Sequence, residues 1–251
     1  MEINNINWAE LLVGTFLGSI LVPLGIWLSQ KIIQFIIDQF PARKLLGDFV
    51  NNDTPCKLFI RDFILESGSK IISIEPRVGQ GYVPNVFELW PEVEGLATSY
   101  ILNVLGNVGK TRNIHVVKMS QDRGEWNANI IVLGAQAQKS FDFYKYMKKV
   151  AYSIDSQYIY DQRHEIVDME NGYGYGLILK AENPAKSGSY GFLIGGFGTL
   201  GTLAAAYYFR TNFQKLGRDF GNKPFGVMVR CPITAGEEAT QRLSERDVKF
   251  V

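Results

Sequence analysis

Histidine and cysteine are scarce in this chain of 251 residues, which contains only two of each. Cys56 and Cys231 stand far apart and in no metal-ligand spacing, so they need not pair and indicate no metal site. Charge of one sign is lacking too, because 26 basic and 25 acidic side chains leave a formal charge of +1. Without a basic stripe interleaved with aromatic residues, the sequence predicts no nucleic-acid partner.

Repeats, low-complexity segments and several catalytic signatures are also absent. The chain contains no P-loop, no His-Glu-x-x-His and no Gly-x-Ser-x-Gly pattern. Its hydrophobic content of 46% and aromatic content of 13% are those of a globular protein. Once the segment up to Phe40 is set aside, about 200 residues remain, which is enough for one domain with a single core.

Lysine and arginine are missing before Lys31, and Leu11–Leu28 forms a long run without any charged side chain. A helix of ~20 apolar residues crosses the ~30 Å hydrocarbon layer of a bilayer, and Trp8 and Trp27 would bracket it at interfacial depth. The sequence therefore predicts a single transmembrane helix. Two alternatives stay open. One is a cleaved secretory signal, although no positive charge precedes the run. The other is a buried core helix of a soluble domain.

The basic residues that follow the run set its predicted orientation. Lys31, Arg43 and Lys44 come after it, so the positive-inside tendency places the C-terminal bulk in the cytoplasm. Residues 31–40 are amphipathic and predict a helix that Pro41 ends. We therefore expect an anchor at residues 1–40 and a cytoplasmic domain at residues 53–251.

Small residues within the anchor suggest that it self-associates. Gly14 and Gly18 form a Gly-xxx-Gly pair, which lets helices approach closely in lipid. Membrane lipid around residues 11–28, a second copy of the chain and a signalling protein are the partners that the sequence suggests.

Strand and helix patterns alternate along the rest of the chain. Short apolar runs rich in β-branched residues predict strands, and segments flanked by glycine or proline predict helices. Strands are predicted at 56–65, 68–76, 113–119, 129–135, 175–184, 190–196 and 225–231, and helices at 91–109, 138–151 and 199–216. The link between the strands at 175–184 and 190–196 is either a hairpin or a longer crossing. This order predicts an α/β fold with a largely parallel, Rossmann-like sheet flanked by helices.

The strongest chemical signal is the segment Phe192–Phe209, FLIGGFGTLGTLAAAYYF, where an apolar strand runs through glycines into an alanine-rich helix. Glycines let backbone amides face a ligand, and the helix N-terminus adds partial positive charge, which together favour an anion. A second glycine turn, at residues 134–136, follows the apolar run NIIVLG, and both turns would meet at one edge of a parallel sheet. The predicted ligand-binding residues are Gly134, Gln136, Gly195, Gly196, Gly198, Thr199 and Thr202. The alternative is that the glycines only permit a tight turn and close packing.

The string GGFGTL at residues 195–200 resembles a loop of the lonely-guy-type nucleotide phosphoribohydrolases and of the wider Rossmann-like SLOG superfamily. This resemblance covers only a short segment around the string. It implies a nucleotide-binding domain in which Gly195, Gly196, Gly198 and Thr199 contact a phosphate of a nucleotide or NAD-like ligand. The hydrolases continue with glutamates in the first helical turn, whereas this chain has Gly201, Thr202 and Leu203, so the resemblance implies binding without that hydrolysis.

Three closely spaced carboxylates, Glu88, Glu92 and Glu94, are the remaining catalytic candidates. Such groups can serve in acid–base chemistry when their pKa values separate, although they also suit the positive start of a helix. Three functions follow from the sequence. The first is a membrane-anchored sensor or effector that binds a nucleotide-like ligand, for which the superfamily resemblance implies bacterial stress or antiviral signalling. The second is an enzyme that cleaves an N-glycosidic bond of NAD or a nucleotide. The third is a membrane-perturbing protein whose α/β domain only mediates assembly.

Overall fold

The structure is a computed structural model that describes residues 8–61, 63–65, 87–89, 92–155, 157–243 and 247–250. Its helices are α1 Trp8–Gln34, η1 Phe35–Gln39, α2 Phe40–Leu46, η2 Gly47–Val50, α3 Glu92–Asn107, η3 Met119–Gln121, α4 Gln138–Tyr146, α5 Gly198–Phe220 and η4 Glu237–Ala239. Its strands are β1 Cys56–Ile60, β2 Phe63–Leu65, β3 Phe87–Leu89, β4 Ile114–Lys118, β5 Asn129–Leu133, β6 Tyr152–Ile154, β7 Ile159–Asp161, β8 Tyr173–Glu182, β9 Tyr190–Gly196, β10 Phe225–Pro232, β11 Gln241–Arg242 and β12 Val248–Lys249. The strand predicted at 68–76 lies outside the described residues.

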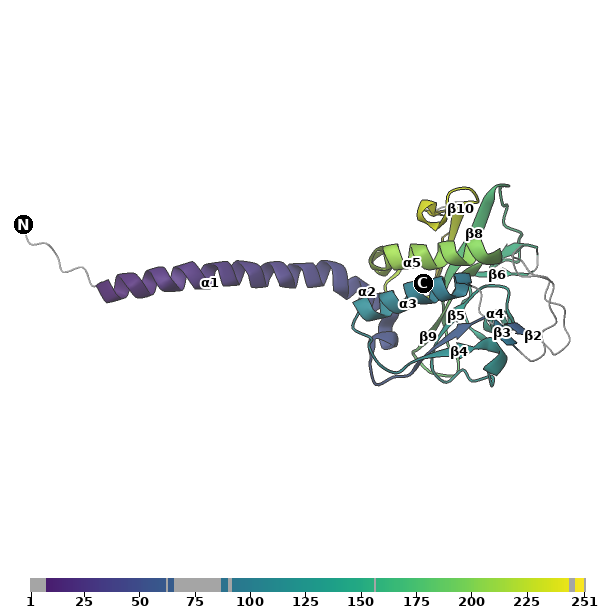
Figure 1. Ribbon diagram of the computed structural model, residues 1–251, viewed down its shortest axis with the longest axis horizontal. Helices are drawn as coiled ribbons and strands as arrows, with labels where there is room; N and C mark the ends of the chain where they lie inside the picture. The colour runs from purple at the N-terminus through teal and green to yellow at the C-terminus, as the bar shows by residue number, and fades with distance from the viewer. Residues whose placement is uncertain are drawn as a thin grey trace, which may run out of the picture.

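Helix α1 projects away from the body as a long rod (Figure 1). It is 27 residues long, and the side chains from Gly14 to Ile37 are all exposed. Large apolar groups such as Phe16 and Val22 therefore have nothing of the body to pack on, being 64% and 59% exposed. The alternative of a buried core helix is wrong for this segment. By length and composition, α1 is able to cross a membrane.

The helix does not end before Pro41, contrary to the sequence prediction. A π-helical turn, η1, follows α1, and α2 begins at once with Pro41 in its first turn. Proline is tolerated there because the first amides of a helix lack an intrahelical acceptor. Ala42, Leu45 and Leu46 are then buried in the body. The residues between the two predicted domains, 41–52, thus belong largely to the body and join it to the anchor without a linker.

The central sheet has eight strands, ordered β11-β10-β8-β9-β5-β1-β4 with β12 also paired to β10. The strands β9, β5, β1 and β4 are parallel neighbours. The strands β8 and β10 extend the sheet in antiparallel pairs. The predicted mixed α/β class with a mostly parallel central sheet is confirmed, and the link between β8 and β9 is a hairpin.

Successive side chains of a strand point to opposite faces of the sheet, so the strands contribute to two separate hydrophobic cores. Leu58 and Ile60 of β1 face the layer that contains α2, α3 and α5, whereas Phe59 faces the layer that contains α4. β5 is buried at every position, as the continuous apolar run predicts for a strand covered on both faces.

Two helices differ from their predicted bounds. Helix α5 begins at Gly198, one residue before the predicted start, and runs beyond the predicted end at residue 216 to Phe220. Gly217 lies inside the helix because α2 approaches it closely, and Gly221 with φ +58° follows the helix end instead. Helix α4 stops at Tyr146 because residue 148 pairs with residue 182 at the sheet.

Candidate functional site

The two glycine turns lie side by side, as their predicted shared edge requires. β5 and β9 are parallel neighbours, and the Gly134 N–H donates a hydrogen bond of 2.9 Å to the Ile194 carbonyl. β1 pairs with β5 on its other side, which brings Arg61, directly after β1, to the same edge. In open α/β sheets, ligands bind outside the carboxyl ends of parallel strands. We call this place the carboxyl edge.

Three of the motif glycines allow close backbone packing. A Cβ on Gly195 would lie 2.4 Å from the carbonyl carbon of Gly134. A Cβ on Gly196 or Gly201 would lie 2.1 Å or 2.2 Å from the Tyr175 carbonyl oxygen. These separations are far below van der Waals contact, so any larger residue would push the turns or α5 away from the sheet. The packing explanation therefore holds for these three positions.

Gly196 and Thr202 are hydrogen-bonded to each other. The Gly196 N–H donates to Thr202 Oγ1 over 3.3 Å, and the Thr202 hydroxyl donates to the Gly198 carbonyl over 3.1 Å. Thr202 is also buried, at 3% exposure. Both residues therefore hold the turn in shape, while the groups able to meet a ligand lie at the residues between them.

The start of α5 contains the backbone and side-chain groups that a ligand could contact. Gly198 and Thr199 are exposed, and Gly198 has φ +59°, a conformation that glycine adopts without strain. The first intrahelical bond that leads into α5 runs from Gly201 N–H to the Phe197 carbonyl, so the preceding amides have no acceptor within the helix. The helix has no side-chain N-cap and no acidic residue in its first turn. A helix of 23 residues thus directs an uncompensated positive end at the carboxyl edge.

Hydrogen bonds from three side chains fix the conformation of the Gly134 turn. Ser140 Oγ donates to the Gly134 carbonyl over 2.6 Å, and the Tyr144 hydroxyl donates to the Ala135 carbonyl over 3.1 Å. Gln136 uses its side-chain amide to donate to the Asp155 carbonyl over 2.8 Å. The Gln136 side chain thus fixes the turn against the β6–β7 segment, and this bond would have to break before the same amide nitrogen met a ligand.

Glu94 is the candidate carboxylate that the structure brings to this edge. Its side chain is buried at 1% exposure at the start of α3, and Oε1 lies 3.6 Å from the position of a Cβ on Gly134. Arg61 Nε approaches Oε1 to 3.4 Å. Burial raises the pKa of Glu94 to about 7, and the guanidinium of Arg61 opposes that rise. Glu94 Oε2 has no hydrogen-bond partner among the described residues.

The remaining candidate carboxylates do not have described side chains. Glu88 belongs to β3 and Glu92 begins α3, and beyond these backbone positions they lie outside what the structure describes. The sequence favours Glu94 as a helix-start charge that complements the helix dipole, and the structure shows its side chain buried at that helix start. Arg61 was missed. The signal that identifies it is its position directly after an apolar strand of the parallel sheet.

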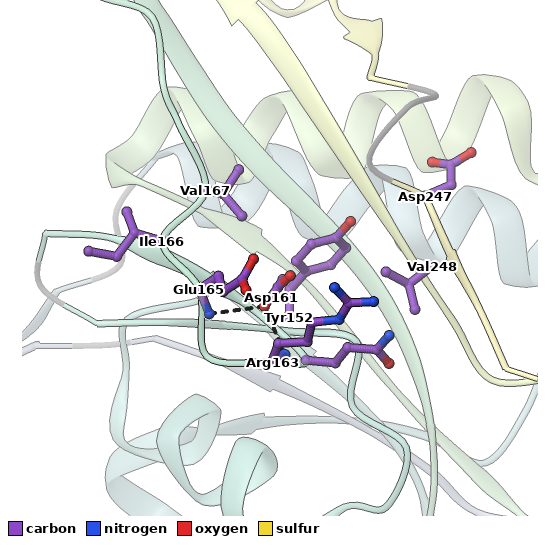
Figure 2. A pocket seen from close by; sticks show the side chains of 9 residues that line it. Tyr152, Asp161, Arg163, Glu165, Ile166, Val167, Asp247 and Val248 are labelled. Atoms are coloured by element: carbon purple, nitrogen blue, oxygen red, sulfur yellow. Dashed lines mark hydrogen bonds between the residues drawn. The ribbon is translucent and has the colours of Figure 1, made fainter.

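A separate cavity of about 260 Å³ lies between the β6–β7 segment and the C-terminal residues Asp247 and Val248 (Figure 2). Figure 2 shows the Asp161 carboxylate turned toward the backbone of its own turn, where it accepts N–H bonds from Arg163 and Glu165. Asp247 is ion-paired with Arg242. These acidic groups are already engaged, and the cavity shares no lining residue with the carboxyl edge.

Comparison of the chain with protein-family models and with curated proteins finds no match to either.

Proposed function

We propose that this protein is a membrane-tethered module that binds a small nucleotide-like anion at the carboxyl edge and reports its presence as a sensor or effector. The observation that carries the proposal is the uncapped start of α5, where Gly198 and Thr199 are exposed. They follow Gly195, which packs on the Gly134 turn. Helix N-termini bind phosphate groups because their free amides and dipole favour negative charge.

Polar groups next to the glycine turns support a ligand larger than a single phosphate. Arg61 and Gly134 directly follow β1 and β5, and Gly195 lies near the carboxyl end of β9, so these residues stand at three adjacent strands. Neighbouring strands lie ~4.8 Å apart, so about 10 Å separates the first strand from the third. That distance suits a phosphate at α5 and a sugar or base near Glu94. The resemblance of GGFGTL to the SLOG superfamily supports a Rossmann-like nucleotide site in bacterial stress or antiviral signalling.

The test is a titration of the full-length protein in lipid nanodiscs with AMP and with adenosine. We expect AMP to bind and adenosine to bind at least tenfold more weakly, because only AMP carries the phosphate. Thr199→Glu would place a carboxylate at the start of α5, where it favours the helix dipole and repels phosphate. This variant should fold and lose AMP binding. Thr211→Glu, an exposed position further along α5, is the matched control and should retain it.

Equal affinity for AMP and adenosine in the wild-type chain would contradict the anion site. Retention of AMP binding by Thr199→Glu would contradict its position at α5. In either case, the membrane tether would be unaffected.

Glu94 favours a second candidate function, cleavage of an N-glycosidic bond. A carboxyl with a pKa of about 7 holds a proton at neutral pH and can give it to a departing base. In the hydrolysis of AMP the bond between C1′ and adenine N9 breaks, the oxygen of water bonds to C1′ and loses a proton, and the departing adenine takes the proton of Glu94. The nicotinamide of NAD leaves a pyridinium nitrogen as a neutral molecule and takes no proton, so Glu94 acts as an acid only on the bond to adenine. The first-turn glutamates of the resembling hydrolases are replaced here, so Glu94 would supply the acid from α3.

Chromatography of NAD and AMP after incubation with the full-length protein tests this second function. Release of adenine from AMP by the wild-type chain, and at least a hundredfold slower release by Glu94→Gln with unchanged ligand affinity, would establish an enzyme that uses Glu94 as its acid. Release of nicotinamide from NAD by the wild-type chain would establish cleavage without that acid. Unaltered substrates would leave the binding module as the function.

A further inference from the structure

Four exposed basic side chains gather at the end of the body from which α1 emerges. We call them the basic collar: Arg43, Lys44, Arg218 and Lys223. Arg43 reaches the C-terminal end of α3, where its Nη2 lies 3.3 Å from the position of a Cβ on Gly109. Lys44 covers the C-terminal end of α5, with its Cε 3.2 Å from the corresponding position on Gly221. Arg218 and Lys223 flank that same helix end. In Figure 1, α1 leads into α2, and one end of α3 and one end of α5 lie near this junction.

Three carboxylates with described side chains at this end, Asp48, Asp53 and Asp219, are paired with basic residues outside the collar. Asp53 lies 3.5 Å from Arg112, Asp48 lies 3.4 Å from Lys186, and Asp219 lies 2.6 Å from Arg242. Among the described residues, no carboxylate forms an ion pair with any of the four collar residues. The end of the body that faces the anchor therefore carries uncompensated positive charge, although the whole chain has a formal charge of only +1.

An amphipathic stretch, residues 29–40, joins the uncharged run Leu11–Leu28 to this end of the body. Ile33, Ile37 and Phe40 are each more than half exposed, and Pro41 already packs on α5. The uncharged run is ~27 Å long at ~1.5 Å per residue, which by itself matches a hydrocarbon layer of ~30 Å. An amphipathic helix buries its apolar face at the boundary between headgroups and acyl chains, so the exposed apolar side chains of residues 29–40 suit that depth. Because α2 is fixed in the body, residues 29–40 at the interface bring the collar to the lipid headgroups.

We propose that the basic collar binds anionic lipid headgroups and thereby holds the body against the membrane with its carboxyl edge directed away from the surface. The partner is a lipid surface rich in acidic headgroups, since exposed basic residues beside a membrane span are attracted to such surfaces over about one Debye length. Each collar residue is expected to favour the docked orientation about fivefold. This inference rests on the tether of the proposed function and is independent of the ligand site.

The test measures how close two positions of the full-length protein lie to lipid headgroups. A fluorophore is attached at Thr111→Cys, in the exposed loop beyond Gly109, or at Thr199→Cys, about 28 Å from Arg218 along α5. Cys56 and Cys231 are buried and stay in place. The protein is placed in nanodiscs of phosphatidylcholine alone, or of phosphatidylcholine mixed with phosphatidylglycerol, together with lipids that carry a headgroup quencher. We expect quenching at Thr111→Cys to rise at least twofold with the anionic lipid, quenching at Thr199→Cys to stay constant, and high salt to remove the difference.

Charge-neutral variants identify the residues responsible. Replacement of the four collar residues by Gln should abolish the rise at Thr111→Cys, and Arg218→Gln with Lys223→Gln alone should reduce it. The matched control replaces four exposed basic residues elsewhere by Gln: Arg123, Lys145, Lys148 and Arg163. This variant should keep the rise in quenching at Thr111→Cys. Equal quenching in both lipids, or an unchanged rise in the collar variant, would overturn the proposal. Extraction of the protein from membranes by alkaline carbonate would overturn the tether itself, while AMP binding is measured separately.

Discussion

At the residue scale, the glycines of the 195–201 segment differ in what a side chain would meet. A Cβ on Gly196 would lie 2.1 Å from the Tyr175 carbonyl oxygen, whereas nothing lies within 4 Å of the Cβ position of Gly198. The sequence predicts a glycine-rich turn between a strand and a helix, and that prediction is confirmed. The sequence does not tell which glycines are packed against other backbone and which are accessible to a ligand. The backbone next to Gly196 belongs to β8, the neighbouring strand of the β8–β9 hairpin.

This difference predicts unequal costs for alanine at the two positions. Gly196→Ala should destabilise the body by about 3 kcal/mol or more, since backbone on both sides would have to move. Gly198→Ala should cost about 1 kcal/mol, which is the strain of its left-handed backbone. Thermal unfolding of the two variants in detergent measures both. Similar losses of stability would show that the turn is not packed as described.

Glu94 gives the stability of the body a predictable pH dependence. Its pKa rises from an ordinary value of 4.5 to about 7 because burial disfavours the carboxylate. The folded state therefore binds the proton more tightly than the unfolded state, so the stabilisation is complete below pH 4.5 and is lost as the pH rises to 7. The expected loss is about 3 kcal/mol.

Glu94→Gln should remove this pH dependence, because glutamine imitates the protonated carboxyl at every pH. Denaturant unfolding of both proteins between pH 4.5 and pH 8 provides the comparison. Parallel curves for the wild-type chain and the variant would mean that another group is responsible.

At the scale of elements, α5 connects the candidate site with the anchor. Its first turn lies at the carboxyl edge, and Gly217 near its other end packs against α2, which continues α1. Lys180 of β8 strengthens this joint, since its buried Nζ donates to the Leu45 carbonyl over 2.7 Å and to Asn222 Oδ1 over 3.1 Å. A helix of 23 residues is ~35 Å long, so a ligand at one end can influence the anchor through one rigid element.

Gly217→Val should disrupt this joint. A Cβ there would lie 2.1 Å from the Pro41 carbonyl oxygen, so α2 would have to leave α5. We expect amides in residues 42–46 to lose at least tenfold in hydrogen-exchange protection, while β5 keeps its protection. Gly106→Ala on α3, where nothing lies within 4 Å, is the control and should change neither. Full protection of α2 in Gly217→Val would refute the close contact.

Most helices and strands could be predicted from local patterns, and the exceptions have physical causes. The run NIIVL predicted β5, and the glycines around residues 195–198 predicted the start of α5 within one residue. The predicted end of the helix at residue 216 falls short because glycine commonly terminates helices, whereas Gly217 lies inside α5 and allows a contact with Pro41, which is far away in the sequence.

At the scale of the whole molecule, the anchor and the body are distinguished by exposure. The described apolar side chains of α1 are exposed, while β5 at the centre of the body is buried at every position. This separation could be read from the sequence, because an uncharged apolar run as long as Leu11–Leu28 is rare in a soluble domain. The pairing of Arg61 with Glu94 could not, since it depends on the order of strands in the sheet and on where α3 begins.

A charge in the middle of α1 should prevent membrane insertion. Val22→Asp places a carboxylate near the centre of the span, where it costs about 3 kcal/mol. We expect the variant to become extractable from membranes by alkaline carbonate with its body still folded. Val116→Asp, on the exposed strand β4, is the matched control and should remain in the membrane fraction. Carbonate-resistant Val22→Asp would argue against a transmembrane α1.

Native mass spectrometry of the full-length protein released from nanodiscs tests the central claim most directly, because it weighs the chain together with whatever the carboxyl edge holds. We expect the wild-type protein to carry a phosphate-containing small molecule, either retained during purification or taken up from added AMP, and Thr199→Glu to carry none. A wild-type spectrum without any such adduct in the presence of AMP, or an identical adduct on Thr199→Glu, would contradict the anion site at the start of α5.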